Sequence, residues 1–325
     1  MLCASVPSHG QEPQQPASTL SINVRVVAVD ALVRDRSGDL VHHLTRDDFS
    51  LTEDGKPQTI HYFTEDEDLP LTIGLMVDTS GSQRTFFAEQ QVASKTFLTN
   101  MLTRPQDNAF IVRFDNNVLL LQRMTSDLAR LDLALGKFTL IFSPRPGPPA
   151  GTLLYDAICG TAHNAFLDQF HDQAQAAPTA RPGRRAIVIL TDGEDNGSIK
   201  KRDEAAECAQ RANITVYTAL YTTRDPGPLE NDDPRVEVPP YIHLMGRTVM
   251  ERISRATGGR VFVVSKKLPI ERIYAQIQED LRRQYRIGYT PPPSAPGNSH
   301  VLELKPRDKR FKIQARVGYY TPSAP

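Results

Sequence analysis

The sequence predicts an α/β fold in which a doubly wound, mostly parallel sheet is flanked by a smaller β-sheet or sandwich. Two strand-length and largely apolar runs, Leu71–Val77 and Arg185–Thr191, show no polar/apolar alternation, which is typical of strands covered on both faces. Strands and helices then alternate across residues 71–283, as they do in parallel sheets. The two ends of the chain are instead rich in strand and turn signals.

Residues 70–284 are expected to carry the parallel sheet. The predicted strands are Leu71–Val77, Asn108–Phe114, Val118–Leu121, Arg185–Thr191, Ile214–Tyr221 and Val261–Val264. The predicted helices are Arg84–Leu102, Asp127–Phe138, Thr152–Phe170, Lys200–Ala212, Arg247–Thr257 and Leu268–Arg283. The fifth helix should end at Gly258-Gly259, because glycine readily takes the left-handed conformation that closes helices. Two proline-containing segments, 144–151 and 222–244, are expected to be loops.

Two β-rich segments, residues 20–66 and 285–320, are expected to form one flanking domain. A long strand with a bulge is predicted from Ser21 to Arg34. A hairpin around Asp54-Gly55 should join Phe49–Glu53 to Gln58–Phe63. Near the C-terminus, residues 285–289 and 311–319 alternate polar and apolar side chains, which predicts two further strands. Because a lone hairpin is only marginally stable in water, the two segments should pair and leave the body inserted between them.

Residues 1–19 are polar and rich in proline, which predicts a disordered leader or the remnant of a secretory signal. Small residues near a possible cleavage point favour export, so we expect a secreted or periplasmic protein. The alternative is a cytoplasmic chain with a disordered leader.

Composition argues against several kinds of partner. Lys and Arg together number 38, as do Asp and Glu, so the net charge is zero and no overall positive field attracts nucleic acid. No run of about 18 apolar residues is present, so no membrane span is expected. Cys3, Cys159 and Cys208 are too few for a disulfide framework or a zinc site. Cys159 and Cys208 are interpreted as small buried apolar residues, with a bridge between them left open.

Oxygen-bearing side chains follow the ends of both apolar strands. Asp78, Ser80 and Ser82 come directly after the first strand, Asp192 follows the second, and Thr152 opens a helix after a Gly/Pro loop. In open α/β sheets such loops converge at the carboxyl edge of the sheet, where ligands bind. Carboxylates and hydroxyls offer only oxygen, which hard cations prefer. A cation at this edge is therefore expected.

These residues resemble the metal-ion-dependent adhesion site of von Willebrand factor type A domains, which reads Asp-x-Ser-x-Ser, then Thr, then Asp. More narrowly, the chain is similar to von Willebrand factor A-related proteins of acidobacterial type. The resemblance covers roughly residues 22 to 320, and its further motifs are Leu44–Phe49, Glu53–Lys56 with Gln58, Gly151–Ala157, Thr191–Gly193, Thr257–Arg260, Tyr285–Tyr289 and Gly318-Tyr319. It implies a von Willebrand factor A domain over residues 70–284.

The resemblance also implies ligands and a function. Asp78, Ser80, Ser82, Thr152 and Asp192 match the five metal-site positions without departure. The ion is a divalent cation, usually Mg²⁺, with Mn²⁺ or Ca²⁺ as alternatives. Hydroxyl ligands are neutral, so such a site leaves room for an acidic residue of a partner protein to complete the coordination. The chain is therefore expected to be a metal-dependent protein-binding or adhesion module and not an enzyme.

Two other functions stay open. One is an intracellular assembly role, in which the domain docks on a chaperone-like ATPase as some relatives do. The other is a magnesium phosphohydrolase, which would require Asp-x-Asp after the strand with the second carboxylate as general acid. Ser80 stands in that place. Aspartic-protease and P-loop patterns are not matched either.

A structural alternative also exists for the three hydroxyls. Ser80 and Ser82 can cap the helix that follows them, and Thr152 can cap its own helix. Capping, however, does not call for Asp78 and Asp192 at two strand ends.

Two further acids and two loops complete the predicted site. Asp115 and Asp156 lie close to it in sequence, and Asp156 is interpreted as an acid near a helix N-terminus in preference to a ligand. Specificity for the partner is expected in segments 144–151 and 222–244, because irregular loops commonly carry recognition.

Overall fold

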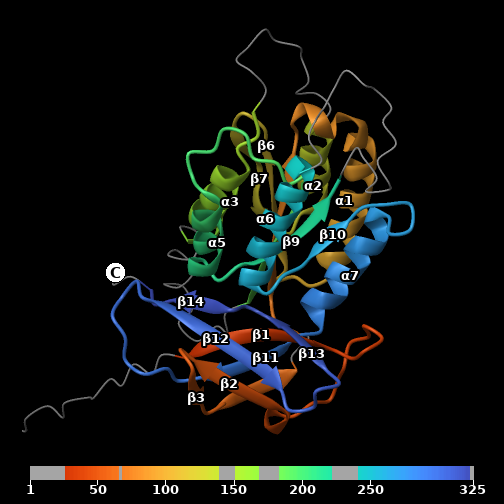
Figure 1. The fold of residues 1–325 in the computed structure, drawn as a ribbon. Coiled ribbons are helices and arrows are strands. Elements are labelled where there is room, and N and C mark those ends of the chain that lie inside the picture. The colour runs from red at the N-terminus through yellow and green to blue at the C-terminus, as the bar shows by residue number, and fades with distance from the viewer. Residues whose placement is uncertain (1–25, 66–67, 139–150, 168–182, 222–240, 323–325) are drawn as a thin grey trace, which may run out of the picture.

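A computed structural model describes residues 26–65, 68–138, 151–167, 183–221 and 241–322. The body of the molecule is built around a six-stranded sheet, and two four-stranded sheets lie below it in Figure 1. The predicted leader, residues 1–19, lies outside the described residues. No described helix is both long enough and apolar enough to cross a membrane.

The six-stranded sheet has the order β10-β9-β8-β5-β6-β7. Its strands are β5 (Leu71–Asp78), β6 (Asn108–Phe114), β7 (Val118–Thr125), β8 (Arg184–Thr191), β9 (Thr215–Leu220) and β10 (Val261–Val263). All neighbours pair in parallel except β7, which runs antiparallel to β6 at one edge. The predicted doubly wound, mostly parallel sheet is confirmed.

Helices cover both faces of this sheet. The helices are α1 (Phe87–Met101), α2 (Leu128–Leu135), α3 (Leu154–Thr161), α5 (Arg202–Arg211), α6 (Tyr241–Thr257) and α7 (Ile270–Arg282). Successive side chains of a strand point to opposite faces. Ile73 and Leu75 accordingly pack in one core with α1, α2 and α7, whereas Met76 packs in a second core with α3, α5 and α6. Burial on both faces explains why β5 shows no polar/apolar alternation.

The body also holds short helical segments at the ends of its helices. A 3-10 segment, Gly81–Phe86, precedes α1, another, Gly136–Phe138, follows α2, and a π-helical segment, Ala162–Leu167, continues α3. Residues 168–170, predicted as the end of that helix, lie outside the described residues.

The fifth predicted helix starts earlier than its sequence indicates. Residues 241–244 were predicted as loop, but α6 already begins at Tyr241. Its end was predicted correctly, since the helix stops at Thr257 and Gly258 has a φ of +84°. Gly259 next passes so close to β9 that a β-carbon there would lie 1.9 Å from the carbonyl oxygen of Val216. Only glycine lets the chain return to the sheet at this point.

Strands from both chain ends build the two smaller sheets, whose orders are β13-β1-β11-β4 and β14-β12-β2-β3. They are β1 (Val27–Arg34), β2 (Phe49–Glu53), β3 (Lys56–Gln58), β4 (Tyr62–Glu65), β11 (Tyr285–Tyr289), β12 (Ser299–Pro306), β13 (Lys312–Ala315) and β14 (Gly318–Tyr320). β1 pairs with β11 and β13, and β2 pairs with β12. Val29 of one sheet and Leu51 of the other belong to one core, so the sheets form a sandwich.

Two predictions within the flanks were wrong in detail, and two elements there were not predicted. Asp54-Gly55 does form a hairpin turn, with φ values of +49° and +77°, but it joins β2 to β3 and not to a strand over 58–63. The single strand predicted over 311–319 is divided between β13 and β14, which belong to different sheets. A short 3-10 segment, Arg46–Asp48, and the strand β12 were not predicted.

Cys159 and Cys208 form a disulfide, with Cα atoms 5.1 Å apart. Their interpretation as separate buried apolar residues was therefore wrong, and the open alternative holds. The bridge joins α3 to α5, which pack next to each other on one face of the sheet. A separation of 49 residues in sequence gave no sign of this proximity.

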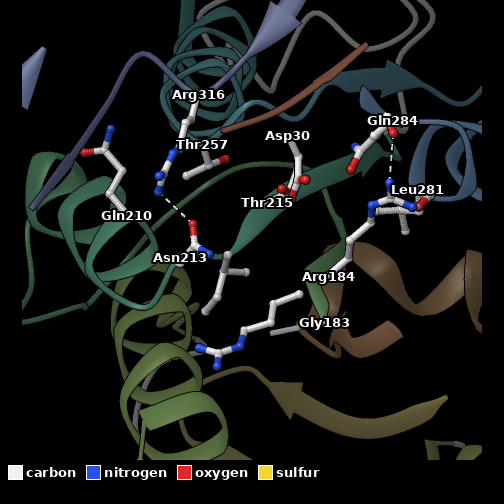
Figure 2. A pocket seen from close by; sticks show the side chains of 12 residues that line it. Asp30, Gly183, Arg184, Gln210, Asn213, Thr215, Thr257, Leu281, Gln284 and Arg316 are labelled. Carbon is white, nitrogen blue, oxygen red and sulfur yellow. Dashed lines mark hydrogen bonds between the residues drawn. The ribbon is translucent and has the colours of Figure 1, made fainter. Parts of the chain in front are cut away.

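A small polar cavity of about 20 Å³ lies between the sandwich and the amino ends of β8 and β9 (Figure 2). The Arg184 guanidinium donates to the carbonyl oxygens of Leu281 and Gln284, at 3.1 and 2.9 Å. Arg316 donates to Oδ1 of Asn213 at 2.7 Å. The Arg184 contacts fix the end of α7, and the Arg316–Asn213 contact ties the flanks to the body. They lie roughly 25 Å, the length of an eight-residue strand, from the opposite edge of the sheet.

Candidate metal centre

The two carboxylates of the predicted site stand at the carboxyl ends of the neighbouring central strands β5 and β8. Asp78 is the last residue of β5, and Asp192 directly follows β8. Beyond Asp192 the chain turns at Gly193, whose φ is +82°. Parallel pairing in register brings these strand ends together at the edge of the sheet remote from the sandwich.

Hydrogen bonds join four of the five predicted residues into one cluster. The Ser80 N–H donates to Oδ1 of Asp78 at 2.9 Å, and the hydroxyls of Ser80 and Ser82 lie 3.2 Å apart. The Ser82 hydroxyl donates to Oδ2 of Asp192 at 2.6 Å. Asp78 is fully buried, whereas Ser82 is exposed, so the cluster reaches from the core of the sheet to solvent.

The fifth residue, Thr152, is held through its main chain. Its N–H and carbonyl oxygen pair with Asn196 at 3.1 and 2.9 Å, and the next N–H, of Leu153, donates to the carbonyl oxygen of Asp115. A β-carbon on Gly151 would lie 2.8 Å from the Asn196 carbonyl oxygen, so glycine permits this approach. Among the described residues, no hydrogen bond joins the Thr152 hydroxyl to the other four members of the site.

The three hydroxyls do not cap helices, so the capping alternative was wrong. Ser80 occupies the N-cap position of the 3-10 segment but makes no side-chain capping bond. The N-cap of α3 is Leu153 and not Thr152, again with no side-chain bond. The hydroxyls of Ser80 and Ser82 point instead to each other and to Asp192.

The cluster concentrates negative charge. Burial, and next the negative charge of Asp192, raise the pKa of Asp78 to about 7, while hydrogen bonds from Ser80 and Thr191 act in the opposite direction. Within the described part of the chain, neither Asp78 nor Asp192 forms an ion pair with Lys or Arg. Two close and largely buried carboxylates are stable only when a proton or another cation compensates them.

Two supporting residues orient the carboxylates. Thr191 donates its hydroxyl to Oδ2 of Asp78 at 2.7 Å, and Gln83 donates its amide to Oδ2 of Asp192 at 3.0 Å. Gln83 is fully buried. Sequence reasoning missed Gln83, because a glutamine between Ser82 and Arg84 gives no signal of burial. Thr191 was noted only as part of a motif.

The side chains of Asp115 and Asp156 form contacts within the segments around the site. Asp115 forms an ion pair with Arg113 at 2.5 Å. Asp156, in the first turn of α3, accepts hydrogen bonds from the N–H groups of Ile199 and Lys200 at 3.0 and 2.8 Å. Its interpretation as an acid near a helix N-terminus is confirmed. Of the loops expected to carry specificity, 144–150 and 222–240 lie outside the described residues.

No protein-family model matches the sequence, and no curated protein matches it. Among solved structures, the chain is similar to an aerotolerance-related membrane protein from Bacteroides fragilis, with 18% identity over 65% of this chain and 98% of that one, and a TM-score of 0.44. It is also similar to manganese-loaded TRAP protein from Plasmodium vivax, with 12% identity over 86% and 100%, and a TM-score of 0.45. A third similar structure is the von Willebrand factor type A protein from Catenulispora acidiphila, with 14% identity over 83% and 73%, and a TM-score of 0.46.

The fold class of the body follows from its own sheet topology. The sheet has the order β10-β9-β8-β5-β6-β7 with one antiparallel edge strand, and helices pack on both of its faces. The Asp-x-Ser-x-Ser motif begins at the last residue of the central strand β5. The body of the chain therefore has a von Willebrand factor type A-like fold.

Proposed function

We propose that the chain is a protein-binding module in which Asp78, Ser80, Ser82, Thr152 and Asp192 hold a divalent cation that binds a carboxylate of a partner protein. The observation that supports this most is the pair of close carboxylates, which form no ion pair with Lys or Arg among the described residues and are joined by hydroxyls that cap no helix. Mg²⁺ is the ion we propose first, since it prefers oxygen ligands; Mn²⁺ and Ca²⁺ share that preference.

The donor set explains why such a cation would bind a further anion. Three of the five proposed ligands are neutral hydroxyls, so the cation keeps affinity for another negative oxygen. Ser82 is exposed, which leaves one side of the cluster open to a partner. Ser80 stands where a magnesium phosphohydrolase would need its general acid, which favours binding over catalysis.

We also propose that the protein is exported. The Cys159–Cys208 disulfide supports this, because structural disulfides persist mainly in oxidising compartments such as the periplasm and the exterior.

Carboxylate binding can be tested with Mn²⁺ as a paramagnetic probe. Mn²⁺ bound to the wild-type chain should enhance the relaxation of water protons. Millimolar Gly-Asp-Gly with an acetylated N-terminus and an amidated C-terminus should lower that enhancement by displacing water from the ion, whereas Gly-Asn-Gly blocked in the same way should not. Equal effects of the two peptides would show that the ion does not select a carboxylate.

Metal binding is expected to depend on pH. Because the pKa of Asp78 is raised to about 7 by burial and then by the charge of Asp192, a proton must leave before the cation binds in acidic solution. The association constant for Mg²⁺ should therefore fall about tenfold for each pH unit below 7 and level off above about pH 8. Calorimetric titration across this range measures it. A constant that does not change between about pH 5.5 and 7 would contradict the role of Asp78.

A further inference from the structure

A second cluster of possible ligands lies in the sandwich, where the β2–β3 turn meets β12. Glu53 ends β2, Asp54 begins the turn, and His300 lies in β12. Nδ1 of His300 lies 2.8 Å from Oδ2 of Asp54 and 3.4 Å from Oε1 of Glu53. One ligand atom from each residue lies within 4.8 Å of the others. None of the five residues of the proposed Mg²⁺ site takes part.

The other side of the imidazole ring is also occupied. Nε2 of His300 lies 2.8 Å from the Ser294 hydroxyl and 3.2 Å from the Thr321 hydroxyl, and the ring stacks on Tyr319. These contacts hold the ring so that Nδ1 faces both carboxylates. Two arrangements suit this geometry: Nδ1 carries a hydrogen and donates it to Asp54, or its lone pair binds a metal ion that lies between the imidazole and the carboxylates.

Charge and burial favour the metal ion. Glu53 is only 4% exposed, and its Oε2 has no hydrogen-bond partner, although Tyr319 donates to its Oε1 at 2.6 Å. A hydrogen bond from Nδ1 to Asp54 leaves this buried oxygen of Glu53 unsatisfied. A divalent cation beside a neutral imidazole compensates both carboxylates, and it offers a partner to the carboxyl group of Glu53.

One of the two distances already suits a metal ion, whereas the 2.8 Å between Nδ1 and Oδ2 of Asp54 is that of a hydrogen bond and must widen when an ion binds. Metal–ligand bonds of about 2.0–2.1 Å in a tetrahedral zinc site separate neighbouring ligand atoms by about 3.4 Å. The separation of Nδ1 and Oε1 has this value. The side chain of Asp54 is 48% exposed, so an ion can enter from solvent. The hydroxyls at Nε2 supply the outer contacts that orient a ligating histidine.

We propose that Glu53, Asp54 and His300 form a second metal site, which takes a divalent ion that accepts imidazole nitrogen together with carboxylate oxygen, Zn²⁺ above all. Mg²⁺ and Ca²⁺ prefer oxygen alone, so the two sites differ in the ion that they select. An ion at the second site links the β2–β3 turn to β12. Through the Tyr319–Glu53 hydrogen bond it also supports β14.

Equilibrium dialysis of the full chain without an affinity tag against Zn²⁺ tests the proposal, with millimolar Mg²⁺ present to occupy the oxygen-only site. The wild-type chain should bind one Zn²⁺ equivalent more than His300→Gln. The matched control is His61→Gln, which removes an exposed histidine of the same domain and should leave the zinc content unchanged. Equal zinc content of wild type and His300→Gln would overturn the proposal and identify the cluster as a histidine–carboxylate hydrogen bond without a metal ion.

A second variant covers the case in which His300→Gln does not fold. Asp54→Asn suits the left-handed turn, since asparagine tolerates a positive φ, and its Oδ1 can still accept the hydrogen bond from the Val301 N–H. Zn²⁺ should bind this variant at least about tenfold more weakly than the wild type. Unchanged affinity would equally overturn the proposal. Co²⁺ in place of Zn²⁺ gives an independent reading, since visible absorption typical of a nitrogen–oxygen tetrahedral site should disappear in both variants.

Discussion

Asparagine in place of Asp78 is expected to stabilise the metal-free protein and at the same time to abolish its response to Mg²⁺. The fold raises the pKa of Asp78 from 3.8 to about 7, through burial and then through Asp192. The folded state therefore binds this proton more tightly than the unfolded state does. The stability of the metal-free protein consequently falls as the pH rises from about 4 to 7, by about 4 kcal/mol at most.

Asparagine removes this penalty without removing the local hydrogen bonds. Its Oδ1 can accept from the Ser80 N–H, and its amide can donate to the Thr191 hydroxyl once that hydroxyl turns. Urea unfolding at about pH 8, with a chelator and then with Mg²⁺, measures both effects. In the wild type, Mg²⁺ should raise the free energy of unfolding; in Asp78→Asn it should not.

Asp132→Asn is the matched control for this experiment. Asp132 is a surface carboxylate of α2 that pairs with Lys95 at 2.6 Å. Its loss should change stability by less than about 1 kcal/mol and leave the Mg²⁺ response intact. An Asp78→Asn protein that is less stable than the wild type without metal, or that still responds to Mg²⁺, would contradict the proposed site.

Replacing both Cys159 and Cys208 by serine is expected to lower the free energy of unfolding by about 4 kcal/mol. The bridge spans a sequence separation of 49 residues, and closing a loop of that length restricts the unfolded chain by this amount in the chain-entropy description. Urea unfolding of the double variant measures the loss. Wild-type protein with its disulfide reduced should show the same loss. If the free energy of unfolding changes by less than about 1 kcal/mol in both samples, the prediction is wrong.

The variant in which serine replaces both Cys159 and Cys208 should also bind Mg²⁺ more weakly than the wild type. The bridge fixes α3, which follows Thr152, against α5, which follows the loop after Asp192. Without it, the position of Thr152 relative to Asp192 depends on the hydrogen bonds between Thr152 and Asn196. The association constant should therefore fall while the requirement for Asp78 persists.

The central sheet and both carboxylates could be predicted because they depend on local patterns. A strand such as β5 is apolar along its length and then changes to Asp78 in one step, which is visible in a window of a few residues. Parallel pairing then requires the loops after β5 and β8 to meet. The position of Asp192 thus followed from the fold class alone.

Other features depend on contacts between distant segments, and for that reason the sequence did not reveal them. The buried Gln83 donates hydrogen bonds to Asp192, which directly follows β8, and to the carbonyl oxygen of Tyr221, which follows β9. In β12 only Leu302 is buried and Val301 is 62% exposed, so its alternation is too weak to indicate a strand. The disulfide requires α3 and α5 to be neighbours, which is a property of the packed sheet and not of either helix.

The shared sandwich has a mechanical consequence. Residues 26 and 322 both lie next to strands of the sandwich, and β1 is bonded along its length to β11 and β13. Tension that pulls these two positions apart would act first on the hydrogen bonds between the strands of the sandwich. The six-stranded sheet would carry little of that load, because it is inserted between β4 and β11. The proposed ligands should therefore keep their positions, and the site should stay able to bind a partner, while the flanking strands are under tension.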